Sequence, residues 1–375
     1  MIAIIIGTRP EIIKMSPVIK ACEKHNLDYF ILHTGQHYSY DMDKVFFKDL
    51  ELPDAKYNLD VGSDSHAKQT AKMMIGIEEI LLKEKPEVVL LEGDTNSVLA
   101  GAIVAAKLPA KCGHVEAGLR TYDEKGNIKF FHGDSVLPEE INRKLIDHIS
   151  DYLFAPTEYS KSILLNEGIP EDKILTTGNT IVDAVFQSLE IAKRKSEILN
   201  KYNLKPKNYF LVTSHRQEHV DSKINLIGIL ESLSKISREY SYPVIFPVHP
   251  RTARKIEEFK LKVSSEIILI DPVGFLDFLN LEASAKLVLT DSGGVQEESC
   301  ILGIPSVTFR NVKEKSYVIP ETIEVGASVL VNTNPDEVSN AVKMMLNKKA
   351  DWKNPFGDGT AGEQIVNYII QQNIL

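Results

Sequence analysis

Three carboxylates occupy positions where they could act as general acids or bases. Asp94 follows the apolar run 88–91, and Glu116 lies near the end of the next predicted strand. Glu139 comes directly after Pro138, at a predicted helix start. A carboxyl group exchanges protons efficiently when the fold holds it within hydrogen-bond distance of the reacting atom. These three acids are therefore the candidate proton-transfer groups, and Asp94 and Glu116 could alternatively be metal ligands.

A second chemical feature is a strand that runs into two glycines. The apolar segment 287–290 ends in Asp291 to Gly294, and residues 295–302 have helical spacing. Glycine lets the backbone approach a ligand, and the first N–H groups of a helix carry partial positive charge. The pattern predicts a phosphate seat, with Glu297 and Glu298 close enough to meet sugar hydroxyls. An ordinary turn is the alternative interpretation.

Positive groups also occur at predicted strand ends. Arg9 lies in the turn after the first strand, and Lys14 lies about one helical turn further on. His215 and Arg216 follow the strand predicted at 209–213. These groups could hold a phosphate and stabilise it as a leaving group. Solvated surface charges and a structural histidine are the alternatives.

The sequence lacks the motifs of several other kinds of catalytic or cofactor-binding site. The turn after the first strand has one glycine, so it does not match the G-x-G-x-x-G pattern of NAD sites. The sequence contains no G-x-x-x-x-G-K-[ST] and no G-x-S-x-G. Neither a carboxylate cluster nor H-x-x-x-H spacing supports a metal at Asp94 and Glu116. We therefore expect neither a cofactor nor a metal.

The composition indicates a globular protein without a nucleic-acid partner. The chain has 375 residues, 43% hydrophobic and 25% charged, and a formal net charge of −9. A nucleic-acid-binding protein is expected to show a basic face. The widely spaced cysteines Cys22, Cys112 and Cys300 indicate buried thiols in a reducing compartment. No signal peptide and no apolar run of the ~18 residues needed for a membrane span are visible, so we expect a cytoplasmic protein.

The elements that must position these residues are alternating strands and helices in two halves. Buried apolar strands predict parallel sheets, and ligands bind beyond the carboxyl ends of such strands. The first predicted domain is 1–190, joined by the C-terminal helix 361–375, and the second is 191–360. The polar stretch 193–208 is the candidate connection. The fold class predicted is α/β, with two similar β/α/β domains facing a central cleft.

Seven stretches, in order over nearly the whole chain, resemble those of the non-hydrolysing UDP-N-acetylglucosamine 2-epimerases. They are 7-GTRPEIIKMSP-17, 93-GDTNS-97, 114-HVEAGLRT-121, 137-LPEEINR-143, 177-TGNTIVDA-184, 290-TDSGGVQEE-298 and 355-PFGDG-359. The resemblance implies a GT-B-like fold of two Rossmann-like doubly wound domains, which usually form a homodimer. It also implies interconversion of UDP-GlcNAc and UDP-ManNAc without NAD or metal, in cell-surface polysaccharide biosynthesis.

The same resemblance implies specific roles. Asp94, Glu116, Glu139 and His215 match the family's catalytic positions. The substrate-binding positions would be Arg9, Lys14, Asp94, Glu116, His215, the backbone at Val273, Phe278 against the uracil, Ser292, Gly293, Gly294, Glu298 and Lys315. Lys315 lies in 313-KEKSYVIPE-321, where the family often has T-E-R-P-E with an arginine. Lysine keeps the positive charge but loses the bidentate fork of arginine.

The reaction chemistry agrees with this set of residues. The C2 proton of the sugar has no adjacent carbonyl, so direct removal is implausible. If UDP leaves first, positive charge develops at C1, the C2 proton becomes removable, and a glycal forms. Protonation on the opposite face and re-addition of UDP then give the epimer. We expect Glu116 and Glu139 to transfer protons, with Asp94 supporting one of them.

Four alternatives remain. The stretch 34-TGQHYSYDM-42 and the long loop 121–136 resemble the branch of the family that acts on UDP-diacetamido-uronic acids. A GT-B glycosyltransferase would use the same two-domain architecture and phosphate seat. A hydrolysing epimerase would release UDP and free ManNAc. A non-enzymatic nucleotide-sugar sensor would bind without turnover.

Overall fold

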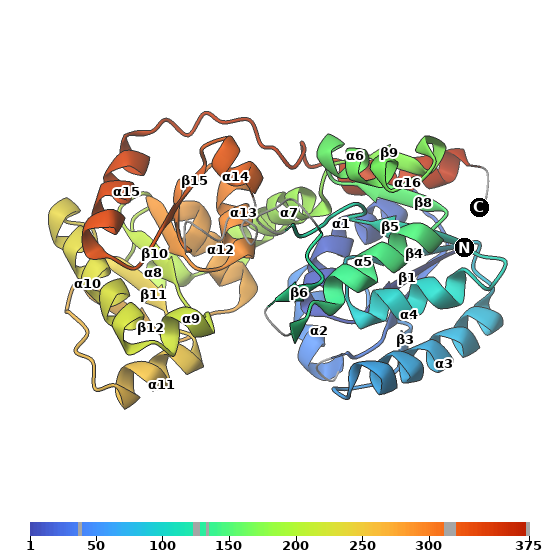
Figure 1. Ribbon diagram of the computed structural model, residues 1–375, viewed down its shortest axis with the longest axis horizontal. Helices are drawn as coiled ribbons and strands as arrows, with labels where there is room; N and C mark the ends of the chain where they lie inside the picture. The colour runs from blue at the N-terminus through green and yellow to red at the C-terminus, as the bar shows by residue number, and fades with distance from the viewer. Residues whose placement is uncertain (37–39, 123–127, 133–134, 311–319, 373–375) are drawn as a thin grey trace. The chain divides into compact units, whose positions relative to one another are not determined.

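The computed structural model describes residues 1–36, 40–122, 128–132, 135–310 and 320–372. These residues form two compact units, Met1–Gln187 with Phe356–Leu375, and Ser188–Pro355 (Figure 1). The sequence prediction divided the chain at 190 and 360. The observed division falls inside a helix, α7 (Thr180–Lys195), rather than in the polar stretch 193–208.

The first unit is built on a seven-stranded parallel sheet. Its strand β1 (Ile2–Ile6) is buried at all five residues, which is typical of a parallel sheet covered on both faces. The strand order is β3-β2-β1-β4-β5-β8-β9. The other strands are β2 (Tyr29–His33), β3 (Tyr57–Asn58), β4 (Val88–Glu92), β5 (Lys111–Val115), β8 (Tyr152–Ala155) and β9 (Ile174–Thr176).

Helices connect these strands, as the alternating sequence pattern predicts. They are α1 (Arg9–Lys24), α2 (Tyr40–Asp49), α3 (His66–Glu84), α4 (Asn96–Ala105), α5 (Pro138–Ile149), α6 (Glu158–Asn166), the 3-10 helix η1 (Glu171–Lys173) and α7. The predicted long loop 121–136 contains a short antiparallel strand pair, β6 (Phe131–His132) with β7 (Ser135–Val136).

The last helix, α16 (Ala361–Gln371), packs against α1 in the first unit. A Cβ atom on Gly362 would lie 2.7 Å from the carbonyl carbon of Pro17, so only glycine allows this close packing. The Asp183 carboxylate accepts hydrogen bonds from the backbone N–H groups of Ala361 (3.2 Å) and Gly362 (3.0 Å). It thereby satisfies donors at the start of α16. Part of the 177–184 motif therefore has a structural role.

The second unit is built on a six-stranded parallel sheet in the order β12-β11-β10-β13-β14-β15. Its strands are β10 (Phe210–Thr213), β11 (Val244–Pro247), β12 (Ile267–Ile270), β13 (Leu287–Thr290), β14 (Ser306–Phe309) and β15 (Ser328–Val331). Its helices are α8 (Ile198–Lys201), α9 (Gln217–Val220), α10 (Lys223–Tyr240), α11 (Pro250–Glu258), α12 (Phe275–Ser284), α13 (Gly293–Ile301), α14 (Pro320–Glu324) and α15 (Pro335–Asn347).

Alternate residues of β10 enter two separate apolar cores. Phe210 and Val212 pack in a cluster that includes Leu226 of α10. Leu211 packs in a different cluster, together with Leu281 of α12. Because side chains alternate across a strand, helices must cover both faces of this sheet. The α/β, doubly wound class predicted from the sequence is confirmed.

The strand orders identify where each sheet can bind a ligand. The order reverses between β1 and β4 in the first sheet and between β10 and β13 in the second. Such a switch point opens a crevice beyond the carboxyl ends of the strands. The turns after these strands are therefore the candidate ligand-binding positions of the two units. Within the described part of the chain, no helix is long and apolar enough to cross a membrane.

Residues 180–199 read as one helix in the sequence, but α7 ends at Lys195 and the short α8 begins at Ile198. Ile198 is buried and continues the apolar pattern of α7, in which Ile191 and Ala192 are buried. Hydrophobic periodicity therefore did not reveal the break between the two helices.

Candidate functional site

The turn after β1 brings three strand ends together around Gly7. A Cβ atom there would lie 2.1 Å from Thr34 Oγ1 and 2.1 Å from Ser97 Oγ, so the close approach requires glycine. The Gly7 N–H donates to Glu11 Oε2 (2.6 Å), and Thr8 Oγ1 donates to Glu11 Oε1 (2.9 Å). Burial raises the pKa of Glu11 to about 7. Glu11 therefore holds the turn from which Arg9 projects.

Lys14 of α1 lies between two carboxylates at the carboxyl ends of adjacent strands. Its Nζ is 2.5 Å from Glu116 Oε1 and 3.2 Å from Glu92 Oε1. Asn179 Nδ2 donates to the same Glu116 oxygen over 3.1 Å. Lys14 and Glu116, both predicted as site residues, are thus in direct contact. Glu92, the last residue of β4, was not predicted, because it reads as the end of a buried strand.

The pKa values of the two carboxyl groups at Lys14 are shifted in opposite directions. Burial raises the pKa of Glu92 well above its usual range, and the nearby Glu116 charge adds to this effect. Burial would also raise the pKa of Glu116, but Lys14 and Asn179 outweigh it, so its pKa is lowered. Glu116 also has a positive φ of 70°, which is uncommon for a residue other than glycine. The local backbone is therefore under constraint at this acid.

Asp94, in the turn after β4, is held by α5. Arg143 Nη2 lies 2.5 Å from Asp94 Oδ2, and Asn142 Nδ2 donates to the Asp94 carbonyl over 2.7 Å. Arg143 also pairs with Glu140, which lies three residues earlier on α5. The sequence did not reveal that Arg143 joins Asp94, because the two residues are far apart in the chain. Glu139 is exposed in the first turn of α5.

Arg9 is oriented by α2. Its Nε lies 3.5 Å from Asp43 Oδ1, and its guanidinium carbon is 5.3 Å from the centre of the Phe46 ring. His33, at the end of β2, contacts the same Asp43 at 3.3 Å. Asp43 and Phe46 were not predicted, because neither follows a strand nor belongs to a recognisable motif.

In the second unit, the two glycines form the first turn of α13. The helix begins at Gly293, two residues earlier than predicted, and Ser292 Oγ accepts a hydrogen bond from the Val295 N–H (3.5 Å). Gly294 is exposed, and the nearest atom to a Cβ built there is Ser292 Oγ at 3.9 Å. The helix start therefore has open space where an anion could approach the backbone N–H groups.

A buried carboxylate connects this helix start to the turn after β10. Asp291 accepts hydrogen bonds from the backbone N–H groups of His215 (3.0 Å) and Arg216 (3.0 Å) and from Ser214 Oγ (2.9 Å). His219 Nδ1 is 3.1 Å from the same side chain. Burial would raise the pKa of Asp291, but His219 and the backbone donors lower it. Sequence reasoning missed Asp291, although its place between a strand and two glycines was a usable signal.

His215 projects from this turn with its ring partly exposed. Its Nδ1 lies 3.3 Å from Asp291 Oδ1, and 46% of the side chain is exposed. The ring centre is 5.9 Å from that of His249. The predicted residues His215 and Ser292 to Gly294 are thus linked through Asp291 at the switch point of the second sheet. This arrangement can present donors to a phosphate.

The remaining predicted residues of the second unit lie on or near α12 and α13. Val273 and Phe278 are partly buried against an apolar core. Burial raises the pKa of Glu298 to about 7. It also raises the pKa of the fully buried Glu282, and the Glu298 charge adds to this effect. Both carboxyl groups therefore bind a proton more tightly than an exposed glutamate does. Lys315 lies outside the described residues.

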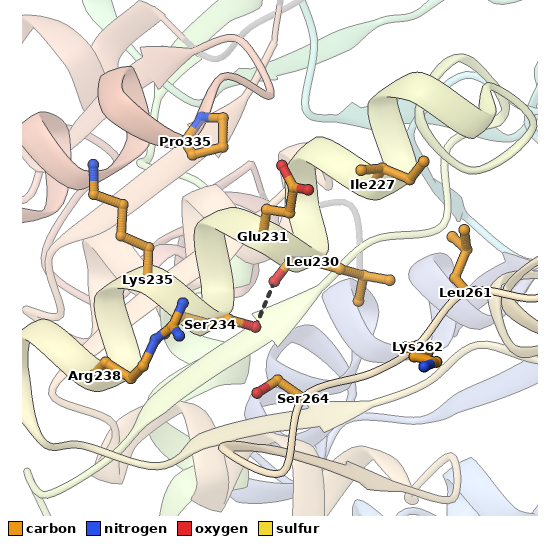
Figure 2. Close-up of a pocket in the computed structure, with 10 residues that line it drawn as sticks. All are labelled: Ile227, Leu230, Glu231, Ser234, Lys235, Arg238, Leu261, Lys262, Ser264 and Pro335. Carbon is orange, nitrogen blue, oxygen red and sulfur yellow. Dashed lines mark hydrogen bonds between the residues drawn. The ribbon is translucent and has the colours of Figure 1, made fainter.

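A separate cavity of about 660 Å³ lies beside α10 (Figure 2). Its walls carry both signs of charge, including Glu231 and Arg238, and Lys235 pairs with Asp336 over 2.5 Å. None of the described site residues lines this cavity. Among the described residues there is also no group of three or more His, Cys, Asp or Glu side chains arranged to hold a metal ion.

Comparison with known proteins identifies relatives over the full chain. The sequence model of the family described as UDP-N-acetylglucosamine 2-epimerase matches residues 20–370. The UDP-N-acetylglucosamine 2-epimerase of Methanocaldococcus jannaschii is 53% identical over 374 residues, which cover 98% of each chain. The UDP-2,3-diacetamido-2,3-dideoxy-D-glucuronate 2-epimerase of Pseudomonas aeruginosa is 39% identical, covering 97% of this chain and 98% of the relative.

A solved structure gives the same result for the fold. The crystal structure of the M. jannaschii UDP-GlcNAc 2-epimerase in complex with UDP-GlcNAc and UDP superimposes with a TM-score of 0.80. The match covers 99% of both chains at 53% identity. The GT-B-like architecture implied by the sequence is therefore confirmed. The chain belongs to the UDP-N-acetylglucosamine 2-epimerase family.

Proposed function

We propose that the chain is a non-hydrolysing UDP-N-acetylglucosamine 2-epimerase that interconverts UDP-GlcNAc and UDP-ManNAc. The observation that carries this proposal is the 53% identity, over 99% of both chains, to a relative whose structure contains UDP-GlcNAc and UDP. The geometry supports it. Acids and a lysine lie at the switch point of one sheet, and the start of α13, with its open space beside Gly294, lies at that of the other.

The mechanism that we propose begins with loss of UDP. The C1–O bond breaks, and its electron pair goes to the β-phosphate oxygen. That oxygen would be stabilised by the start of α13, His215 and Arg9. A carboxylate removes the C2 proton, and a C1–C2 double bond forms. Proton addition to the opposite face and return of the UDP oxygen to C1 give the epimer. We assign the proton transfers to Glu116 and Glu139, supported by Asp94.

We assign binding roles to the remaining residues. Lys14 would orient Glu116, since the two are in direct contact. The Val273 backbone and Phe278 would meet the uracil, Glu298 the sugar hydroxyls, and Lys315 the diphosphate. In addition, we propose a cytoplasmic homodimer that serves cell-surface polysaccharide synthesis. Light scattering tests the oligomeric state, because a homodimer has twice the mass of one chain.

The direct test is incubation of the pure protein with UDP-GlcNAc in D₂O. Epimerisation through a glycal would place deuterium at C2 of both UDP-ManNAc and recovered UDP-GlcNAc. Absence of exchange with every UDP-N-acetylhexosamine offered would contradict the proposal. Free ManNAc and UDP as the main products would indicate a hydrolysing enzyme instead. Transfer only with an added acceptor would indicate a glycosyltransferase, and binding without turnover a sensor.

A second candidate is epimerisation of a UDP-diacetamido-uronic acid. The 39% identity to the P. aeruginosa enzyme favours it, as does the stretch 34–42, of which residues 37–39 lie outside the described residues. The higher identity to the UDP-GlcNAc enzyme makes it the second choice. A side-by-side assay of the two substrates decides, because the correct substrate should have the larger kcat/KM.

A further inference from the structure

Glu92 is a buried acid that the mechanism above does not use. It ends β4, where all five residues are buried, and its side chain is 2% exposed. Its Oε1 lies 3.2 Å from Lys14 Nζ, which also contacts Glu116. A carboxyl group at this depth is costly unless it is paired or protonated. The question is therefore which of the two acids is ionised.

The charges in this cluster do not balance if every group is ionised. One ammonium, Lys14, would face the carboxylates Glu92 and Glu116, and the buried Glu11 would add a further negative charge nearby. Two carboxylates that share one site cannot both ionise readily. One retained proton between Glu92 and Glu116 would leave the pair neutral with Lys14. The cluster is therefore expected to hold one proton.

The geometry indicates which acid holds the proton. Glu116 has the shorter contact to Lys14, 2.5 Å, and also accepts a hydrogen bond from Asn179. The guanidinium of Arg143 on α5 adds positive charge on its side. Glu92 has the longer contact to Lys14 and is the more deeply buried of the two, 2% against 11% exposed. Donors and cations favour a negative Glu116, and burial favours a neutral Glu92.

We propose that Glu92 is a positioning residue that stays protonated and donates a hydrogen bond to Glu116, keeping Glu116 ionised as the base for the C2 proton. The catalytic part of this inference rests on the proposed function, but the protonation of Glu92 does not. The charged groups that face Glu92 are Lys14 and Glu11 from α1 and Glu116 from the end of β5. The opposite pKa shifts of Glu92 and Glu116 agree with this assignment.

The first test is Glu92→Gln, in which the amide copies the shape and the donor of a protonated carboxyl group. We expect kcat/KM to stay within about threefold of wild type and its pH profile to keep its shape. An ionised Glu92 that works through its charge predicts the opposite, a loss of ~10²-fold. That loss in a variant with unchanged thermal stability would overturn the proposal. Glu78→Gln, an exposed site on α3, is the matched control.

The second test is Glu92→Leu, which removes the donor to Glu116. We expect the acid limb of the kcat/KM profile to move to higher pH by about one unit, a tenfold loss at the acid side. If Glu92 were ionised, its removal would relieve repulsion and move that limb to lower pH. If Glu92 had a purely structural role, Glu92→Leu would lower the thermal stability and leave the acid limb of the kcat/KM profile at the same pH. Either of these results would contradict the proposal.

The third test does not need turnover. Infrared difference spectra of wild type minus Glu92→Gln at neutral pH should contain the carbonyl band of a protonated carboxylic acid. If that band is present but UDP-GlcNAc is not epimerised, the protonation of Glu92 holds and the proposed function fails. If epimerisation occurs but the band is absent, the proposed function holds and the protonation of Glu92 is contradicted.

Discussion

The two sheets carry different kinds of polar groups at equivalent positions. At the switch point of the first sheet the groups are ionisable side chains, with Lys14 between Glu92 and Glu116 and Arg143 against Asp94. At that of the second sheet they are largely backbone N–H groups, arranged around one buried carboxylate, Asp291, and a helix start. The topology is shared, but the chemistry is not.

This difference suits the two units to different tasks, proton transfer in the first and phosphate binding in the second. Buried side-chain carboxyl groups can be tuned by their neighbours, as the opposite pKa shifts of Glu92 and Glu116 show, and so they suit proton transfer. Backbone N–H groups at a helix start do not titrate, and so they suit a phosphate that must be held in every protonation state. We therefore expect substitutions in the first unit to affect turnover and substitutions at the start of α13 to affect affinity for UDP.

The largest expected effect is that of Glu116→Gln. The amide keeps the shape but cannot accept the C2 proton, so we expect kcat to fall by ~10³-fold while UDP affinity stays within about threefold. Asp94→Asn and Glu139→Gln should each lose at least ~10²-fold in kcat. Steady-state kinetics and calorimetric titration with UDP measure the two quantities. An equal loss of UDP affinity would contradict the assignment of proton transfer to the first unit and of UDP binding to the second.

The next largest effect is expected for Asp291→Asn. The amide replaces one carboxylate oxygen with a donor, so it cannot satisfy all of the N–H and O–H groups that converge on Asp291. Removing an acceptor from buried donors should lower the free energy of unfolding by about 3 kcal/mol and weaken UDP binding. Chemical denaturation and titration with UDP test this. Ser222→Ala, which removes the N-cap of α10, is a control for stability loss without loss of affinity.

Gly294→Ala should affect binding alone. A Cβ there would enter open space, so the folded protein should tolerate it, and alanine favours a helix more than glycine does. If a phosphate lies against this turn, the methyl group would displace it and UDP affinity should fall by ~30-fold, about 2 kcal/mol. Unchanged UDP affinity would show that the phosphate lies elsewhere. Gly303→Ala is not a suitable control, because Gly303 has a positive φ of 69°.

The sequence predicted most of the fold because buried parallel strands are continuous apolar runs. Val88 to Glu92 and Leu287 to Thr290 could be recognised in this way, and their ends located the candidate site. Strand β3, Tyr57–Asn58, was missed, because two residues are too few to show a pattern.

The contacts between candidate site residues were harder to predict than the positions of these residues at strand ends. The contacts of Arg143 with Asp94 and of Asp43 with Arg9 join elements that are distant in the sequence. Glu92 was also missed, since its significance depends on the lysine that α1 places beside it. Residue type and strand position thus indicate where chemistry can occur. The protonation states depend on burial and neighbours, which only the folded chain provides.

The smallest expected effect is a pH-dependent change in stability at the Glu282–Glu298 pair. Burial raises the pKa of Glu298 to about 7 from an ordinary value of 4.5. Because the folded-state pKa is raised, the stability linked to this proton is fully present below pH 4.5 and is lost as the pH rises through about 7. The wild-type protein should therefore lose unfolding free energy over this window.

Glu282→Gln should reduce that loss, because it removes one of the two carboxyl groups that would repel each other at high pH. We expect the variant to have a higher melting temperature than wild type at pH 8 and a similar one at pH 5. Thermal unfolding across this range measures the difference, with Glu257→Gln at the surface of the same unit as the control. Parallel curves for wild type and Glu282→Gln would mean that this pair does not titrate between pH 5 and pH 8. The contrast between a tunable first unit and a phosphate site built from backbone donors would then be sharper.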